Sequence, residues 1–163
     1  MVAQKAVDAL LEKTWVKFKK DTKVQQLIVR MFQKIGSSSE VITAIANLLN
    51  SVCSSNKDMV IHITTILNSL ANDENDSSFG DAQIIPTIIT VIRTYQQDGW
   101  TIKYCLQVIK SILGGSTVKN RDDLIATMGI PLLFNVGGSF LKNIDFLQVF
   151  SDVLLRMAQD DML

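Results

Sequence analysis

An internal repeat constrains the fold of this chain more than any other feature of its sequence. Ile84-Ile85-Pro86-Thr87-Ile88-Ile89 and Gly129-Ile130-Pro131-Leu132-Leu133-Phe134 each open an apolar segment with a proline, and the two prolines are 45 residues apart (131 − 86). At the same offset, five apolar residues of the segment that follows fall on five others: Ile102, Cys105, Val108, Ile109 and Ile112 on Leu147, Phe150, Val153, Leu154 and Met157. A repeat of this length is typical of stacked helical units, each too thin to bury its own apolar face.

The repeat extends towards the N-terminus with a changing period. At an offset of 42 (105 − 63), the second set aligns with an earlier one: Ile63, Ile66, Leu67 and Leu70 with Cys105, Val108, Ile109 and Ile112. At an offset of 35 (63 − 28), the alignment continues to Ile28, Met31, Phe32 and Ile35. A drifting period suits loops of different length between units better than a coiled coil, whose register must hold. We therefore predict a single domain, 1–163, with four units at roughly 1–36, 37–72, 81–114 and 118–160.

Apolar residues recur at three- and four-residue spacing along the whole chain, and no segment shows sustained period-two alternation. We therefore expect an all-α fold. Helices are predicted at 2–20, from Asp21-Thr22 to 35, from Ser37-Ser38-Ser39-Glu40 to about 52, at 57–71, from Pro86 to Asp98-Gly99, at 100–113, at 119–128, from Pro131 to Gly137-Gly138, and at 144–160.

Three details of this prediction concern helix ends and loops. Ser37 and Glu40 have the spacing of a capping box. Gly137-Gly138 predicts a helix end, and the polar segment 72–81 predicts a loop. The first two helices are expected to bury one stripe each: Val7, Leu10, Leu11, Trp15 and Phe18, then Val24, Leu27, Ile28, Met31, Phe32 and Ile35.

Composition limits the classes of function. Hydrophobic residues make up 47% of the chain and charged residues 20%, which favours a folded globular domain over a disordered one. The net charge is zero, so we expect no general attraction to nucleic acid or to a membrane surface. The charge is uneven, however. Residues 1–34 contain eight basic and three acidic residues, whereas residues 141–163 contain two basic and four acidic ones.

Cysteine usage and hydropathy indicate the compartment. Cys53 and Cys105 are the only cysteines, too few for a disulfide framework, and Cys105 lies on a predicted core stripe. The first residues include Asp8 and Glu12, so they lack the apolar core of a signal peptide. No window approaches 18 uninterrupted apolar residues, so we expect no membrane span. A reducing, cytoplasmic location is therefore predicted, and a nuclear one stays open.

Catalytic and metal-binding patterns are weak. His62 is the single histidine, and it has no acidic or thiol neighbour at helical spacing, so a zinc site or a histidine-based triad is not expected. An acidic run at 73–76 hints at a calcium loop, but Ser78 and Ile84 occupy the positions that require glycine and glutamate. We therefore predict a protein without cofactors or catalytic residues.

Three segments carry a resemblance to a known family. The run 120–133, which reads Asn-Arg-Asp-Asp-Leu-Ile-Ala-Thr-Met-Gly-Ile-Pro-Leu-Leu, resembles the short first helix, the Gly-x-Ile-Pro corner and the second helix of an armadillo repeat. Residues 81–89 resemble the same corner, with Ile84 where glycine is usual, and residues 66–71 resemble the end of the third helix. Residues 1–72 are closer to HEAT-type helix pairs. The resemblance implies a right-handed α-α superhelix of about four repeats, whose third helices line a concave surface that binds extended peptides.

One branch of that family, the importin-alpha proteins, carries asparagines and tryptophans in fixed rows of the concave surface. The aligned asparagine positions here are Lys34, Ser69, Ser111 and Arg156, and the aligned tryptophan positions are Arg30, Thr65, Gln107 and Asp152. None matches, so binding of nuclear signals by that mechanism is not expected.

The same alignment predicts a partner-binding surface. The residues a half-turn from each core stripe should face outward in rows: Arg30, Lys34, His62, Thr65, Asn68, Lys103, Tyr104, Gln107, Lys110, Asp152 and Arg156. Five of them are basic and only Asp152 is acidic, so one hypothesis is a site for an extended acidic or phosphorylated peptide. The alternative is a solvated face whose lysines bind nothing.

Two hypotheses for the whole protein follow. The leading one is a non-catalytic scaffold or adaptor that binds a partner protein or peptide. The alternative is a regulatory domain that binds a small GTPase or a cytoskeletal protein, because formin regulatory regions resemble this architecture. We also expect self-association, or a missing neighbour at one end, because apolar residues lie at both ends: Leu10, Leu11, Trp15 and Phe18 at one, and Phe146, Phe150 and Leu155 at the other.

Overall fold

The computed structural model describes residues 5–7, 9–15, 17–18, 21–35, 38–72, 76–113 and 118–159. Every regular element within these residues is a helix, so the all-α prediction is confirmed. The elements are η1 (Ala9–Trp15), α2 (Thr22–Ile35), α3 (Ser39–Val52), α4 (Lys57–Leu70), α5 (Asp76–Asp81), α6 (Ile84–Thr94), α7 (Gly99–Leu113), α8 (Val118–Ala126), α9 (Gly129–Ser139) and α10 (Ile144–Gln159).

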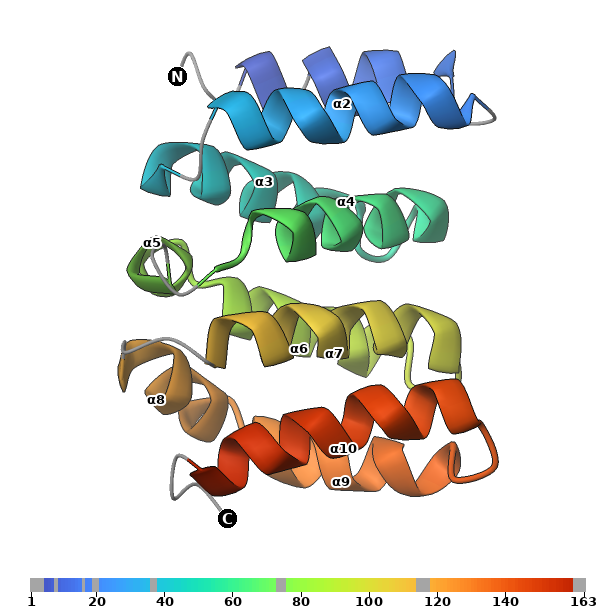
Figure 1. Ribbon diagram of the computed structural model, residues 1–163, viewed down its shortest axis with the longest axis vertical. Helices are drawn as coiled ribbons and strands as arrows, with labels where there is room; N and C mark the ends of the chain where they lie inside the picture. Colours follow the sequence, from blue (N-terminus) through green and yellow to red (C-terminus); the bar gives the residue numbers. More distant parts are fainter. Residues whose placement is uncertain are drawn as a thin grey trace.

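The helices form layers along the longest axis of the molecule (Figure 1). The pairs η1 and α2, α3 and α4, α6 and α7, and α9 and α10 follow one another in chain order (Figure 1). In successive layers α4 packs against α2, α7 against α4, and α10 against α7. The short helices α5 and α8 lie together at one side of this stack, and α5 also packs against α3 (Figure 1). Helices at the same place in the repeat are therefore neighbours in space.

One apolar core runs through all the layers, from Val7 to Met157. The residues that define the repeat in α4 and α7 are at most 4% exposed: Ile63, Ile66, Leu67, Leu70, Cys105, Val108, Ile109 and Ile112. In α10, Val153 and Met157 are fully buried, whereas Leu147 and Leu154 are half-buried. The core positions of these helices were therefore predictable from the offsets alone.

The corners before α6 and α9 have the same backbone conformation. Gln83 (φ 53°, ψ 44°) and Met128 (φ 54°, ψ 33°) are both left-handed, and they are 45 residues apart (128 − 83). Left-handed backbone costs a residue with a Cβ roughly 1–2 kcal/mol. Pro86 and Pro131 then lie in the first turn of each helix, where no intrahelical N–H bond is lost. The repeat thus extends from sequence to backbone geometry.

The prediction of a loop at 72–81 is wrong, because residues Asp76–Asp81 form helix α5. The segment is mostly polar, but it contains one large apolar side chain, Phe79, which is fully buried. Its burial holds α5 against α3 and α8. A helix therefore precedes residue 81, where the third unit was predicted to begin.

Two predicted helix ends have different outcomes. Helix α3 begins after Ser38, whose side chain makes no capping hydrogen bond, whereas Ser37 of the predicted capping box lies outside the described residues, so that box stays a prediction. Gly137-Gly138 lies inside α9 rather than ending it. A Cβ on Gly137 would lie 2.3 Å from Cζ of Phe150, so this glycine allows α9 and α10 to approach closely.

The N-terminal layer differs from the prediction in its helix type and in its burial. η1 is a π-helix, whereas the periodicity predicted an α-helix over 2–20. Phe18, Leu27 and Met31 were expected in the core but are 40%, 56% and 45% exposed. These three belong to the outermost layer, whose α2 packs mainly on η1 and α4 among the described helices. Of the residues predicted to form the two apolar ends, Phe18 and Leu155 are exposed, Leu10 is half-buried, and Leu11, Phe146 and Phe150 are buried.

Candidate functional site

The structure places the eleven candidate residues on the four helices that follow one another through the layers. Three of them are exposed: Arg30 and Lys34 on α2, and Arg156 on α10. The other eight are half-buried: His62, Thr65 and Asn68 on α4, Lys103, Tyr104, Gln107 and Lys110 on α7, and Asp152 on α10. We refer to these eight side chains, together with Trp100 and Ser111 of α7, as the ladder face.

Two polar contacts cross the ladder face from helix to helix. The hydroxyl of Ser111 on α7 donates to Oδ1 of Asn68 on α4 at 2.9 Å. Nζ of Lys110 on α7 lies 2.6 Å from Oδ2 of Asp152 on α10. The predicted rows are therefore adjacent in space, as the alignment requires.

The ion pair changes the electrostatics expected for this face. Lys110 was predicted to receive a carboxylate from a partner, but Asp152 already neutralises it. Both side chains are about two-fifths exposed, 42% and 38%, so water screens the pair and its net stabilisation is roughly 0–1 kcal/mol. Among the described residues, Arg30, Lys34 and Arg156 form no ion pair, and they lie on the two outermost helices of the set.

An aromatic cluster at the start of α7 joins two predicted site residues, Lys103 and Tyr104, to Trp100, which was not predicted. Trp100 is 54% exposed, and its ring packs edge-on against Tyr104 with centroids 5.6 Å apart. Nζ of Lys103 lies 5.1 Å from the Trp100 ring centroid, a cation–π geometry. Lys103 also lies 3.8 Å from the carboxylate of Asp145 on α10. Trp100 could have been found by spacing, because it precedes two predicted residues by one helical turn.

The first turn of α7 is held in place by Asp98. Oδ1 of Asp98 accepts from the backbone N–H groups of Trp100 at 3.2 Å and Thr101 at 3.4 Å, and Oδ2 accepts from the Thr101 hydroxyl at 3.1 Å. These bonds satisfy N–H groups that would otherwise lack partners at the start of the helix. The aromatic cluster is therefore presented on a capped, well-defined helix end.

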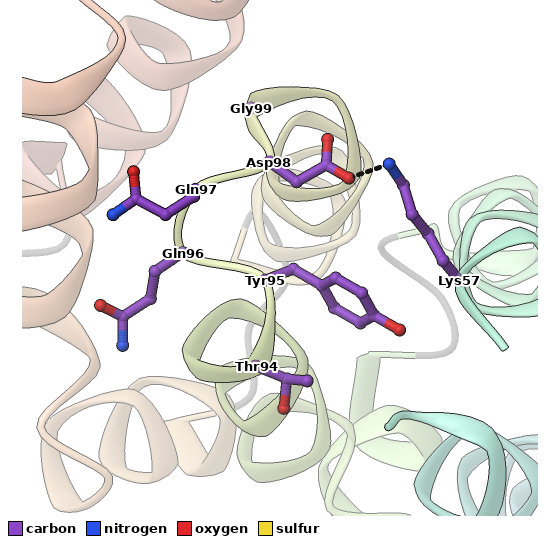
Figure 2. Close-up of a pocket in the computed structure, with 7 residues that line it drawn as sticks. All are labelled: Lys57, Thr94, Tyr95, Gln96, Gln97, Asp98 and Gly99. Atoms are coloured by element: carbon purple, nitrogen blue, oxygen red, sulfur yellow. Dashed lines mark ion pairs between the residues drawn. The ribbon is translucent and has the colours of Figure 1, made fainter. Parts of the chain in front are cut away.

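A pocket of about 610 Å³ adjoins this cap (Figure 2). It is lined by Lys57 and by the turn 94–99 between α6 and α7. Asp98 forms an ion pair with Lys57, while Gln96 and Gln97 point to the other side of the turn (Figure 2). The Tyr95 hydroxyl donates to the carbonyl oxygen of Cys53 at 2.6 Å.

The Lys57–Asp98 ion pair and the hydrogen bond from Tyr95 to Cys53 tie the α3–α4 turn to the α6–α7 turn. Burial alone would raise the pKa of Asp98, but the bonds from Lys57 and Thr101 outweigh it, so that pKa is lowered. The hydrogen bond with Asp98 in turn raises the pKa of Lys57. Both groups stay charged at neutral pH, and their ion pair helps to position the start of α7.

Burial perturbs the two side chains that sequence analysis weighed as chemical groups, His62 and Cys105. Burial lowers the pKa of His62, against the opposing charge of Asp58, so the imidazole is neutral at physiological pH. Burial raises the pKa of Cys105, which keeps its thiol protonated and unreactive. Within the described part of the chain, no three His, Cys, Asp or Glu side chains are grouped to hold a metal ion. None of the described helices has the length and apolarity needed to cross a membrane.

Comparison of the chain with protein-family models, with curated proteins and with solved structures finds no match. The resemblance to armadillo repeats therefore rests on the sequence motifs given above. The layered packing of helices and the shared left-handed corners are compatible with it.

Proposed function

We propose that this chain is a non-catalytic, armadillo-like scaffold that binds a partner protein through its ladder face. The observation that carries this proposal is the cluster of Trp100, Lys103 and Tyr104, which leaves a large aromatic ring more than half exposed on a rigid helix. Tryptophan and tyrosine are enriched among the residues that dominate binding energy at protein interfaces. The proposal includes a right-handed superhelix of about four repeats, which follows from the family resemblance. It also includes a cytoplasmic site of action, which follows from the cysteine usage and hydropathy of the sequence.

The ladder face offers the two kinds of contact that an extended peptide needs. Trp100 and Tyr104 supply apolar area for a side chain of the partner. Gln107 is half-buried one turn further along α7, and Asn68 and Ser111 lie beside it, so their polar groups can hydrogen-bond a peptide backbone. A peptide that runs across α4, α7 and α10 would contact both the aromatic and the polar side chains.

The charge of the partner is set mainly by Lys103 in this proposal. Because Lys110 is paired with Asp152, it contributes less attraction for an acidic group than its row position suggested. Lys103 has a longer contact to Asp145, whose side chain is 76% exposed, so a partner carboxylate can displace that contact. We therefore expect a peptide with an apolar side chain next to a single acidic or phosphorylated residue.

Selection from a random peptide display library tests the proposal, followed by titration of the selected peptides. Trp100→Ala and Lys103→Ala should each weaken binding at least tenfold while the far-UV circular dichroism spectrum stays helical. The matched control is Ile125→Ala, which truncates an apolar residue of similar exposure, 53%, on α8. If the selected peptides bind Trp100→Ala and Lys103→Ala as tightly as the wild type, the ladder face is not the binding site.

A further inference from the structure

Two lysine–aspartate ion pairs join α7 to α10, and they differ in how firmly they are closed. Nζ of Lys110 lies 2.6 Å from Oδ2 of Asp152, which is a direct charged hydrogen bond. Nζ of Lys103 lies 3.8 Å from Oδ2 of Asp145, too far for such a bond, and the Asp145 side chain is 76% exposed. The two pairs are seven residues apart on each helix (110 − 103 and 152 − 145), so the closed pair is a matched reference for the open one.

The open pair is built so that each member keeps its place without the other. The Lys103 side chain is only 19% exposed, and its ammonium group also lies 5.1 Å from the centroid of the Trp100 ring. Asp145 lies in the first turn of α10, where the helix dipole stabilises a negative charge. Both groups therefore stay charged and positioned when the contact between them opens.

A partner that supplies only an acidic group would leave this pair unbalanced. A carboxylate bound to Lys103 would also lie close to Asp145, because the two side chains of the protein are 3.8 Å apart. Like charges this close repel each other and lower the affinity. A basic group of the partner that binds Asp145 removes the repulsion and leaves two ion pairs in place of one long contact. The charges at this site therefore favour a partner that carries both signs.

We infer that the partner segment carries an acidic residue for Lys103 and a basic residue for Asp145, and that the long contact between these two side chains opens to receive them. This inference rests on the proposed function and adds a second charged residue to the motif expected there. Arginine suits the basic position best, because its planar guanidinium binds a carboxylate through two parallel hydrogen bonds.

The arrangement of the helices sets the spacing of the two charged residues. Lys103 lies on α7 and Asp145 on α10, and these helices pack against each other. The axes of packed helices are about 8–10 Å apart. Side chains two residues apart lie on the same side of an extended chain, at a separation of about 7 Å. We therefore expect the acidic and the basic residue of the partner to be two positions apart.

Selection of peptides from one random display library, run in parallel on the wild type and on Asp145→Asn, tests this inference. Peptides selected by the wild type should pair an acidic residue with a basic one at a fixed spacing. Peptides selected by Asp145→Asn should keep the acidic residue and lose the basic one. Asp145 is exposed, so the variant should fold, and its circular dichroism melting curve checks this.

Titration then separates two opposite expectations for Asp145→Asn. A peptide with an acidic residue alone should bind this variant more tightly than the wild type, because Lys103 has lost a competing carboxylate. A peptide with both charges should bind it about three- to tenfold more weakly. Replacing the basic residue of that peptide by glutamine should weaken its binding to the wild type but not to the variant. Asp152→Asn removes the same charge two helical turns away and should change the affinity by less than about twofold.

The outcomes distinguish this inference from the proposed function. Selected wild-type peptides that carry an acidic residue but no basic one overturn the inference alone. So does a peptide with both charges that binds Asp145→Asn as tightly as the wild type. Peptides that bind Trp100→Ala and Lys103→Ala as tightly as the wild type, or a selection that yields no peptide, overturn the proposed function and the inference with it.

Discussion

At the scale of single residues, the fold depends on a few positions whose backbone or side chain is unusual. Gln83 and Met128 hold a left-handed conformation although both have a Cβ. Gly137 gives the Phe150 ring room that no other residue would leave. His62 is a half-buried base in the middle of α4. Each of these features yields a measurable expectation.

Relief of the left-handed strain should stabilise the protein. Met128 is 64% exposed, so Met128→Gly loses little packing. Removing strain of roughly 1–2 kcal/mol is partly offset by the larger entropy that glycine has in the unfolded chain, so we expect a net gain of up to about 1 kcal/mol. Urea denaturation measures the change. Gln148→Gly, in the middle of α10, should instead destabilise by about 1 kcal/mol.

The two neighbouring glycines of α9 should respond oppositely to the same substitution. Gly137→Ala places a methyl group against the Phe150 ring and should cost about 1–3 kcal/mol or more, because the core must shift. Gly138 has nothing within 4 Å of an added Cβ, so Gly138→Ala should be neutral or stabilising through its better helix propensity. Equal melting temperatures for the two variants would contradict the described packing of α9 on α10.

His62 should make stability depend on pH below neutrality. Its pKa is lowered in the folded protein by burial, so on acidification the unfolded chain takes up a proton first. Stability should therefore fall as pH drops below about 6.5, the ordinary histidine pKa, until the folded-state pKa is reached. Urea midpoints between pH 7.5 and pH 5 measure this loss. His62→Gln should reduce the loss of stability. If the urea midpoints of the two proteins fell equally with pH, His62 would not be the source of that loss.

At the scale of elements, amphipathic helices were predictable and their exceptions have physical causes. The stripes of α4 and α7 are buried because each helix has a neighbouring layer on both sides. Leu27 and Met31 share the pattern but belong to the outermost layer, which periodicity cannot reveal. Helix α5 escaped prediction because a single buried residue, Phe79, gives no periodic signal.

The contacts of the candidate site were also predictable only in part from residue spacing. The offsets correctly placed Asn68 near Ser111 and Lys110 near Asp152 as neighbouring rows. They did not reveal that Lys110 and Asp152 neutralise each other, because pairing depends on side-chain conformation across two helices. Trp100 was missed because it lies in the first turn of its helix, before the aligned rows begin.

Helix α7 is the element on which the stack depends most, since it packs against both α4 and α10. Ile109→Asp places a carboxylate at a fully buried position of this helix, which should cost about 3–5 kcal/mol or unfold the domain. Far-UV circular dichroism melting measures the effect. Ile125→Asp, at an exposed position of α8, is the matched control and should melt within a few degrees of the wild type.

At the scale of the whole molecule, one continuous core joins all the layers. We therefore expect the chain to unfold in a single transition, although long repeat arrays can lose such cooperativity. Trp15 belongs to η1 in the first layer and Trp100 to α7 in the third. The Trp15→Phe and Trp100→Phe variants should each show a fluorescence midpoint in urea that coincides with their circular dichroism midpoint. In Trp100→Phe the remaining tryptophan is Trp15. A fluorescence midpoint for this variant at lower urea than its circular dichroism midpoint would show that the N-terminal layer unfolds separately.

The layered arrangement also has a mechanical consequence. Because α2, α4, α7 and α10 succeed one another along the longest axis, tension between the first and last layers passes through every interface in series (Figure 1). The compliances of the interfaces then add, so a small opening at each one lengthens the molecule by their sum. The surface pairs Asn68–Ser111 and Lys110–Asp152 can break and re-form while the apolar core beneath them stays closed. The chain should behave as a short elastic element rather than as a rigid rod.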